Sequence, residues 1–597
     1  SGYTLNGWYT AASGGTKISS TTKVTGNKTY YAQWSQNNYE ELNSSGTHVK
    51  YYVTLADAMN SVTSGNTIKV LNNRTENTAS TLKNGKTATL NLNGKKITTT
   101  TNITTISNEG TLTIKDLIGS GYIKNTLTTA SEAIISNTGK LSLGGTKDFI
   151  IGGKSTETSQ NIIHNNAGTL ILSKGTIQQE GILSSMANRY IVYSTEGGNV
   201  TISGATIKTV SDSTTSNDNA ITFYGNSDNK FIMTSGTISA KGKAISSHGS
   251  STSESSPAIK ITGGTIESKE NRAISNESIG LIYINGSKVS ITGKMAGIYN
   301  NSSGIIKVMD GTINASIDGI YNRSGSLTVS GGTIKGDNSA ITNESSTLVT
   351  ITGGTINGVN AGLKLKSGNA LIDGAEITAG GTTSDGTYAQ NAACILNAGY
   401  GTVTIKSGNI QPQVGTNYGI NNTANGIINV LGGTVTSNLG GVGIKATRGK
   451  VILGSKTSEY EGAYVSGYVT AIDLCDSTGE VQLEFGASTD TTVDVNTEIT
   501  ERRPYVTAKG ISVKGDNSEN INIIFRNGCI KTTGGSEGQS GGGVTRIYPF
   551  SDISESQITT VDGYYLHGMN SVVVSEQLTY LKPNSEKDSD EESDSDV

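Results

Sequence analysis

Side chains that could carry out acid–base or metal chemistry are few in this chain of 597 residues, and they are scattered. The four histidines show neither the spacing of a metal-ligand set nor a pairing of base and nucleophile. They are His48, His164, His248 and His567. The sequence therefore predicts no catalytic residue, no metal site and no cofactor.

Three cysteines are present: Cys394, Cys475 and Cys529. An odd, widely spaced set fits neither a disulfide framework nor a zinc site, so we interpret all three as small apolar core residues. The formal net charge is −4 and the pI about 5.8, which indicates no basic surface for nucleic acid. No apolar run approaches the ~20 residues of a membrane-spanning helix, so we expect no membrane insertion.

The elements that would position any site come from a repeat. A Gly-Gly-Thr-Ile phrase returns in the middle of the chain, and between Ile313 and Ile377 its isoleucines are 21, 22 and 21 residues apart. A pair of one small and one apolar residue, such as Ala340-Ile341, moves with it. Two motifs that keep a constant offset define one structural unit.

Each repeat contains three short strands. Asn follows the apolar residue of the pair by two positions, and an alternating strand such as Val349-Thr350-Ile351 comes next. Strands this short are stable only when each repeat pairs with the repeats before and after it, ~4.8 Å away. We therefore predict an all-β fold, a parallel β-helix, with 77 glycines serving its many turns.

The repeat also predicts which side chains lie in register. One buried column should contain Ile313, Ile334, Ile356 and Ile377. A second column should be an asparagine ladder, in which each side-chain amide bonds the next, through Asn300, Asn322 and Asn343. The outer faces should be uniform columns of Thr, Ser, Asn and Lys.

The region before the repeat reads YVTLADAMNSVTSGNTIKVLNN and continues with ATLNLNGKKITTT. Together with the repeat, it resembles the right-handed, pectin-lyase-like β-helix surface proteins of bacteria. The resemblance implies a single-stranded right-handed parallel β-helix over residues 50–575. It also implies a short amphipathic helix at 55–62 that covers the open end of the core.

A second motif, GYTLNGWYTAASGGTKISSTTKVTGNKTYYAQW, occupies residues 2–34. It is similar to the second half of the Listeria/Bacteroides (internalin B-type) repeat of secreted and wall-attached bacterial proteins. The matching positions are Gly2, Tyr3, Gly7, Trp8, Tyr9, Gly14, Gly15 and Tyr31-Ala32-Gln33-Trp34. The resemblance implies a small β-grasp-like repeat fragment at 1–34, and an extracellular location on the bacterial cell surface or cell wall.

Two polar segments flank the predicted β-helix. Residues 35–49 are rich in Asn, Ser and Glu and are predicted to be a linker. Residues 576–597 end in KPNSEKDSDEESDSDV and are predicted to be an acidic, disordered tail. Because residue 1 begins inside a motif and no signal peptide precedes it, we expect the chain to be a fragment.

Enzymes of the resembling fold, such as pectate lyases and polygalacturonases, use clustered carboxylates with a basic residue. Of the groups that the glycosidases need on neighbouring coils, only the isolated His248-Gly249 and His567-Gly568 occur. Asp310 and Asp373 precede Gly at matching places, but about three coils, or ~14 Å, should separate them, too far to share one water. A secreted polysaccharide lyase or glycoside hydrolase stays an alternative, as does a structural stalk.

The turn between the Gly-Thr-Ile strand and the small–apolar pair varies in length. It has five residues in plain repeats, but it is longer at 178–190, 208–219, 378–393, 411–418 and 436–442. Insertions at one place in a solenoid share one side, where repeat proteins bind their partners, although drift in loop length explains them equally well. The candidate ligand-binding residues are Arg189, Tyr190, Asp212, Asp218, Asp385, Tyr388 and Tyr418.

These features together predict a function in adhesion or recognition rather than catalysis. We expect a monomeric, extracellular bacterial cell-surface protein that binds a glycan, or a host or cell-surface protein, and no nucleic acid. The long turns on one side of the β-helix should make the contacts.

Overall fold

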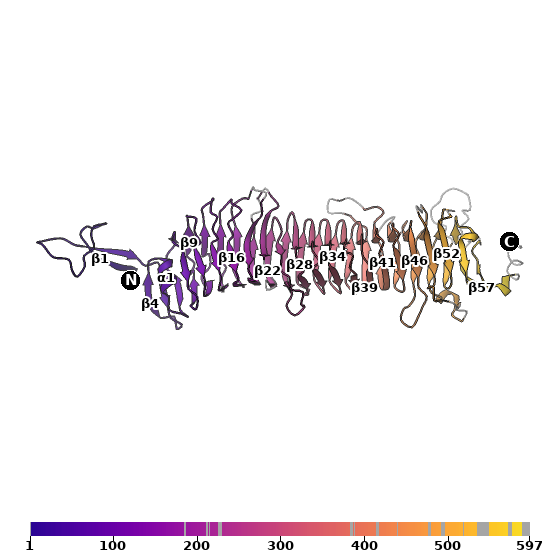
Figure 1. The fold of residues 1–597 in the computed structure, drawn as a ribbon, viewed down its shortest axis with the longest axis horizontal. Helices are drawn as coiled ribbons and strands as arrows, with labels where there is room; N and C mark the ends of the chain where they lie inside the picture. The colour runs from indigo at the N-terminus through magenta and orange to yellow at the C-terminus, as the bar shows by residue number, and fades with distance from the viewer. Residues whose placement is uncertain are drawn as a thin grey trace. The chain divides into compact units, whose positions relative to one another are not determined.

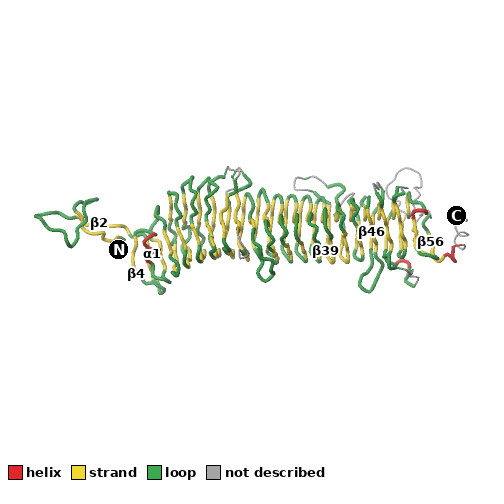
Figure 2. Tube along the Cα trace, in the orientation of Figure 1, coloured by secondary structure: helices red, strands yellow, loops and turns green. Residues whose placement is uncertain are grey.

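The computed structural model is almost entirely β-structured, with short strands joined by turns (Figure 2). The chain divides into two compact units: unit 1 (Ser1–Ser251 and Ser255–Asn271) and unit 2 (Thr252–Glu254 and Arg272–Val597). The residues described are 2–183, 187–209, 213, 215–224, 230–382, 386, 389–413, 417–438, 440–475, 479–490, 493, 496–516, 519–533, 549–570 and 576–587.

Unit 1 begins with antiparallel strands. The first two strands pair with each other, and the third pairs with both the fourth and the fifth. The third strand and the start of the fourth lie within residues 35–49, so the prediction of a linker is wrong there. The five strands are β1 (Tyr3–Tyr9), β2 (Tyr31–Gln36), β3 (Tyr39–Leu42), β4 (His48–Tyr52) and β5 (Thr67–Val70).

Glu41 explains why so polar a segment folds. Its buried carboxylate accepts hydrogen bonds from the Tyr52 hydroxyl at 2.6 Å, the Asn66 amide at 2.7 Å and the Thr63 backbone N–H at 2.9 Å. Burial raises the pKa of Glu41, but these hydrogen bonds outweigh it, and the pKa lies below its usual value. The composition of this segment alone suggested a solvated linker. It did not show the donors to Glu41, because they lie outside the segment and reach it only in the folded chain.

The predicted helix is present as α1 (Leu55–Ser61). Thr54 caps it, since the Thr54 side-chain oxygen accepts a hydrogen bond from the Asp57 backbone N–H at 3.1 Å. Leu55 and Met59 turn inward and are fully buried. The helix therefore covers apolar side chains of unit 1, as its amphipathic pattern predicts.

Beyond α1, the strands of unit 1 stack in three parallel rows, and each strand pairs with its equivalents in neighbouring repeats (Figure 1). Row A contains β7 (Ser80–Leu82), β10 (Ile106–Asn108), β13 (Ile135–Asn137), β16 (Ile163–Asn166), β19 (Arg189–Thr195), β21 (Asp218–Tyr224) and β23 (Ile245–Ser247). Row B contains β5, β8 (Thr87–Asn91), β11 (Thr111–Asp116), β14 (Lys140–Gly145), β17 (Thr169–Leu172) and β24 (Ile259–Ile261). Row C contains β6 (Arg74–Thr75), β9 (Lys96–Thr99), β12 (Tyr122–Asn125), β15 (Ile150–Gly153), β18 (Thr176–Gln179) and β25 (Gly264–Ser268). Two long strands, β20 (Asn199–Lys208) and β22 (Phe231–Ala240), run through both rows B and C.

Unit 2 has the same three rows. Row A contains β26 (Arg272–Asn276), β29 (Ala296–Asn300), β32 (Asp318–Asn322), β35 (Ser339–Asn343), β38 (Ala361–Leu365), β40 (Ala393–Asn397), β42 (Tyr418–Asn422), β45 (Val442–Ala446), β48 (Thr470–Asp473), β51 (Ile511–Lys514) and β54 (Phe550–Ser551). Row B contains β27 (Leu281–Ile284), β30 (Ile305–Val308), β33 (Ser326–Val329), β36 (Val349–Ile351), β43 (Ile427–Val430), β46 (Gly449–Leu453), β49 (Val481–Phe485), β52 (Ile521–Phe525) and β55 (Ile558–Thr560). Row C contains β28 (Val289–Gly293), β31 (Thr312–Ala315), β34 (Thr333–Gly336), β37 (Thr355–Gly358), β44 (Thr434–Thr436), β47 (Tyr464–Gly467), β50 (Tyr505–Ala508) and β53 (Cys529–Thr533). β39 (Ala370–Ala379) and β41 (Thr402–Ile410) run through rows B and C.

The predicted isoleucine column is confirmed. Ile313 pairs in register with Ile334, Ile334 with Ile356, and Ile356 with Ile377. All four side chains are fully buried. The all-β, parallel and repeated arrangement expected from the spacing is therefore present in unit 2.

The asparagine ladder is confirmed as well. The side-chain nitrogen of Asn300 donates to the side-chain oxygen of Asn322 at 2.9 Å, and Asn322 donates to Asn343 at 2.8 Å. Unit 1 has its own ladder, from Asn108 to Asn137 at 2.7 Å and on to Asn165 at 2.6 Å. These amides are buried. Five of the six also donate to a turn carbonyl, and Asn108 donates to the carbonyl of Lys140 at the start of β14, so the ladder secures the turn after row A.

The repeated Gly-Gly phrase has a steric cause. Gly332 adopts a φ of 79°, a conformation that favours glycine. A Cβ added there would lie 2.5 Å from the carbonyl oxygen of Gly311 in the preceding repeat. In this repeat the bend between rows B and C therefore requires a residue without a side chain.

The C-terminal boundary differs from the prediction. Residues 576–583, assigned to the disordered tail, form β57 (Glu576–Pro583), which pairs antiparallel with β53 and with β56 (Tyr564–His567). Thr579 and Leu581 alternate inward and are buried. The alternation of inward and outward residues in β57 is short, and the acidic residues after it dominated the composition on which the prediction was based. Residues 588–597 lie outside the described residues.

Candidate functional site

Arg189 and Asp218, predicted to contact a ligand, instead form an ion pair in the interior of unit 1. The two side chains are 1% and 0% exposed. The guanidinium donates to both carboxylate oxygens, at 3.0 and 2.8 Å, and to the carbonyl oxygens of Ser155 and Gly181, both at 2.8 Å. Both charges are thus compensated inside the fold, and the prediction of ligand contact is wrong for this pair.

Tyr190 and Tyr418 are both partly exposed. Tyr190, in unit 1, is half-buried and stacks on Tyr193 with the ring centres 6.1 Å apart. Tyr418, in unit 2, is half-buried at the start of β42, and its hydroxyl lies 3.5 Å from the Asn391 side-chain oxygen. Asp212, Asp385 and Tyr388 lie outside the described residues. Ligand binding by Tyr190 and Tyr418 stays a prediction.

Unit 2 has a shallow hollow of about 150 Å³ at the ends of β34, β37 and β39. The backbone N–H of Gly380 donates to the Val359 carbonyl at 3.0 Å, and that of Gln413 donates to the Ala379 carbonyl at 2.7 Å. These bonds attach the first residues of two long turns to row C. The hollow therefore lies at the base of turns 378–393 and 411–418, where the sequence predicts binding.

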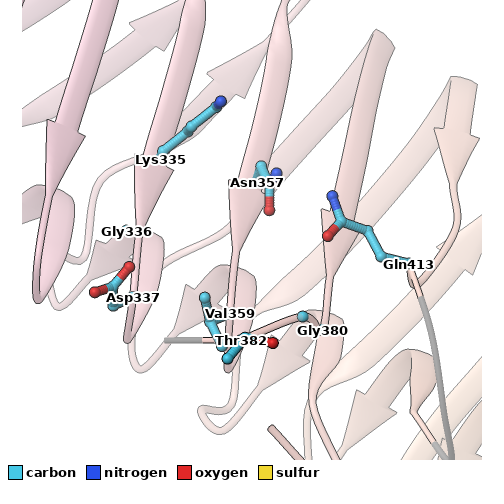
Figure 3. A pocket seen from close by; sticks show the side chains of 9 residues that line it. Lys335, Gly336, Asp337, Asn357, Val359, Gly380, Thr382 and Gln413 are labelled. Atoms are coloured by element: carbon cyan, nitrogen blue, oxygen red, sulfur yellow. The ribbon is translucent and has the colours of Figure 1, made fainter. Parts of the chain in front are cut away.

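The side chains that line the hollow include both hydrogen-bond donors and hydrogen-bond acceptors. Figure 3 shows the side chains of Lys335 and Asn357 on neighbouring coils and that of Gln413 two coils further on, with Asp337 and Thr382 below them. An ammonium, a carboxylate, two amides and a hydroxyl supply both donors and acceptors. Such a set suits a polar ligand with several hydroxyl or amide groups, and its two opposite charges favour no strongly charged ligand.

Two adjacent glycines are among the residues that line this hollow. Gly380 and Gly381 have φ values of 94° and 112°, which side chains rarely adopt. A Cβ on Gly381 would lie 3.2 Å from the side-chain oxygen of Gln413. A larger residue there would press on one of the polar groups that line the hollow.

The titratable side chains in the described part of the chain do not form a metal centre. No group of three or more His, Cys, Asp or Glu there could hold an ion. Asp373, one of the two carboxylates considered for catalysis, accepts a hydrogen bond from Ser407 at 2.6 Å. Of the helices in the described ranges, none is long and apolar enough to cross a membrane.

The sequence analysis missed an aromatic set on the outer face of row A in unit 2. Tyr299 and Tyr321 pair in register, with ring centres 5.5 Å apart. The Arg272 guanidinium carbon lies 3.6 Å from the centre of the Tyr299 ring, and the Lys366 nitrogen lies 6.0 Å from that of Tyr321. The expectation of uniform Thr, Ser, Asn and Lys columns is therefore wrong on this face. The signal was present as Gly-Ile-Tyr-Asn, which occurs twice, 22 residues apart.

Comparisons of the chain with protein-family models, with curated proteins and with solved structures find no match.

Proposed function

We propose that this chain belongs to an extracellular bacterial surface protein that recognises a glycan, or a protein of a host or neighbouring cell. In this proposal each unit is a right-handed parallel β-helix of the pectin-lyase-like kind, and residues 1–34 are a partial internalin B-type repeat. The three parallel rows and the asparagine ladders support the first assignment. The antiparallel pairing of β1 with β2 is compatible with the second.

The hollow of unit 2 is the observation that carries this proposal. It joins donors and acceptors from several coils at the base of the long turns, and regular β pairing holds the residues beneath it. Polar groups on a rigid frame lose little entropy when they bind, which favours recognition. A secreted polysaccharide-degrading enzyme and a plain stalk are the competing assignments. Binding separates the stalk from this proposal, and an assay for products released from polysaccharides separates the enzyme.

The test is binding of the full chain to arrays of glycans and to intact cells. Asn357→Ala with Gln413→Ala should weaken binding about tenfold, because two side-chain hydrogen-bonding groups are lost. Thr292→Ala is the matched control, since it is exposed in the same outer column of row C, three coils earlier. It should bind as the parent does.

Two outcomes would overturn the assignment. A parent chain that binds no glycan and no cell would favour the stalk. Release of reducing ends or unsaturated products from a polysaccharide would favour the enzyme. Equal binding by the parent and the Asn357→Ala, Gln413→Ala variant would exclude the hollow as the recognition site.

A further inference from the structure

Unit 1 has its own aromatic set on the outer face of row A. Because alternate residues of a strand point to opposite faces, His164 and Tyr193 point outward while their neighbours point to the core. His164 pairs in register with Tyr193, with ring centres 5.4 Å apart. The Tyr190 ring stacks on that of Tyr193 at 6.1 Å and an angle of 24°.

A second pair of rings lies beside this set, further along the same strands. Tyr224 pairs in register with the outward-facing Thr195 and ends β21. The Tyr224 ring centre is 4.4 Å from that of His248, which follows β23. Tyr224 is 54% exposed. Five rings thus come from four consecutive coils, and at least one is open to a ligand.

The positions between the rings are polar but uncharged. Thr222 and Ser246 continue the column of His164 and Tyr193, but they are buried, at 1% and 2% exposure, so the polar groups open to a ligand are those of the second column. Asn166 and Thr195 precede Tyr224, and the Thr195 hydroxyl donates to the Asn166 side-chain oxygen at 3.1 Å. The two columns hold no Lys, Arg, Asp or Glu.

The histidine in the first column is half-buried. Burial lowers the pKa of His164 below its usual value. Its imidazole lies 3.4 Å from the Thr195 hydroxyl, so it takes part in the same polar network. The face therefore presents rings, hydroxyls and amides.

We propose that this outer face of unit 1, centred on Tyr193 and Tyr224, binds a neutral glycan chain whose sugar rings stack on the aromatic rings from coil to coil. The inference rests on the proposed recognition function and gives it a ligand class. Aromatic rings on strands offer flat apolar surface at little entropic cost, and the hydroxyls and amides between them match sugar hydroxyls. Neighbouring strands are ~4.8 Å apart, so the rings of successive coils follow one another along the row at this interval.

Other ligand classes fit this face less well. Nucleic acids and acidic polysaccharides need cations, which the two columns lack. A stable protein partner needs on the order of 800 Å² on each side with an apolar centre, whereas here rings alternate with polar groups. The neutral glycan is therefore the ligand whose chemistry matches both the rings and the groups between them.

The experiment measures affinity of the full chain for soluble neutral glucans, mannans and galactans, by affinity electrophoresis and calorimetry. Tyr193→Ala and Tyr224→Ala should each weaken binding about fivefold or more, because each removes a stacking ring. Tyr193→Phe and Tyr224→Phe keep the ring and should bind within about twofold of the parent. Tyr283→Ala, a half-buried ring in row B of unit 2, is the matched control.

Polygalacturonate serves as the charged probe, and thermal melting of every variant verifies folding. The inference is overturned if the folded alanine variants bind neutral glycans as the parent does. It is also overturned if the parent binds polygalacturonate, or a protein, in preference to every neutral glycan.

If the Asn357→Ala, Gln413→Ala variant loses binding while the tyrosine variants do not, this inference fails but the proposed function stands. If the parent binds neither glycans nor cells, both fail.

Discussion

Arg189 holds Asp218 through two parallel hydrogen bonds, of 3.0 and 2.8 Å, between strands β19 and β21 in the interior of unit 1. The same carboxylate accepts a third hydrogen bond, from the Ser213 hydroxyl at 2.6 Å. The charged pair thus ties two coils together at the corner where the turns lengthen. Its position gives it a role in stability rather than in ligand contact.

Arg189→Ala should cost about 3–5 kcal/mol of folding stability, because Asp218 would be left buried without its counter-charge. Thermal and denaturant unfolding of the full chain measure the loss. Arg189→Met combined with Asp218→Leu removes both charges and should recover part of it. A cost below about 1 kcal/mol for the single variant would mean that water reaches the pair.

Ile334→Asp should cost more than about 3 kcal/mol, since the new carboxylate would enter a fully buried column without a partner. Lys335→Asp is the matched control, because the next residue of the same strand points to the outer face. Its melting temperature should stay close to that of the parent. Equal losses from the two substitutions would contradict the assigned inward and outward faces.

Asp318 should make stability depend on pH. Burial raises its pKa, although Thr342 and Asn338 each donate a hydrogen bond to its carboxylate at 3.0 Å. A raised pKa means that folding favours the protonated form, so the parent loses stability as pH rises through the folded pKa. Asp318→Asn cannot ionise, and its stability relative to the parent should increase over that range.

Melting curves of the parent and of Asp318→Asn between about pH 4 and pH 8 measure this difference. Asp373→Asn, at an exposed position, controls for the change in net charge. If the difference in stability between the parent and Asp318→Asn does not change with pH, ionisation of Asp318 does not destabilise the folded state, and this prediction is wrong.

Replacing residues 380–392 by the two-residue turn Val359-Asn360 of the preceding coil should leave the melting temperature nearly unchanged. The replacement joins the end of β39 to the start of β40 as the preceding turn joins β37 to β38. It removes Thr382 and the glycines from the hollow, so binding to glycan arrays or cells should fall. Unchanged binding would assign the long turn to drift in loop length.

The sequence by itself determined the register of the repeats. The spacing is nearly equal between Ile313, Ile334, Ile356 and Ile377. Because side chains alternate between the two faces of a strand, residues at equivalent positions must all point to the same face. Only one stacking brings such residues together, which is why the isoleucine column and the asparagine ladder could be predicted.

Only the tertiary structure decided which charged and aromatic side chains face the solvent. Arg189 and Asp218 are 29 residues apart, at the starts of β19 and β21, and the sequence does not show that they meet inside the fold. Tyr299 and Tyr321 precede Asn300 and Asn322, so the register makes them neighbours, but only the fold shows that their rings lie beside Arg272 and Lys366. Burial of a charge depends on donors and acceptors from distant segments, and the pattern of one strand does not contain them.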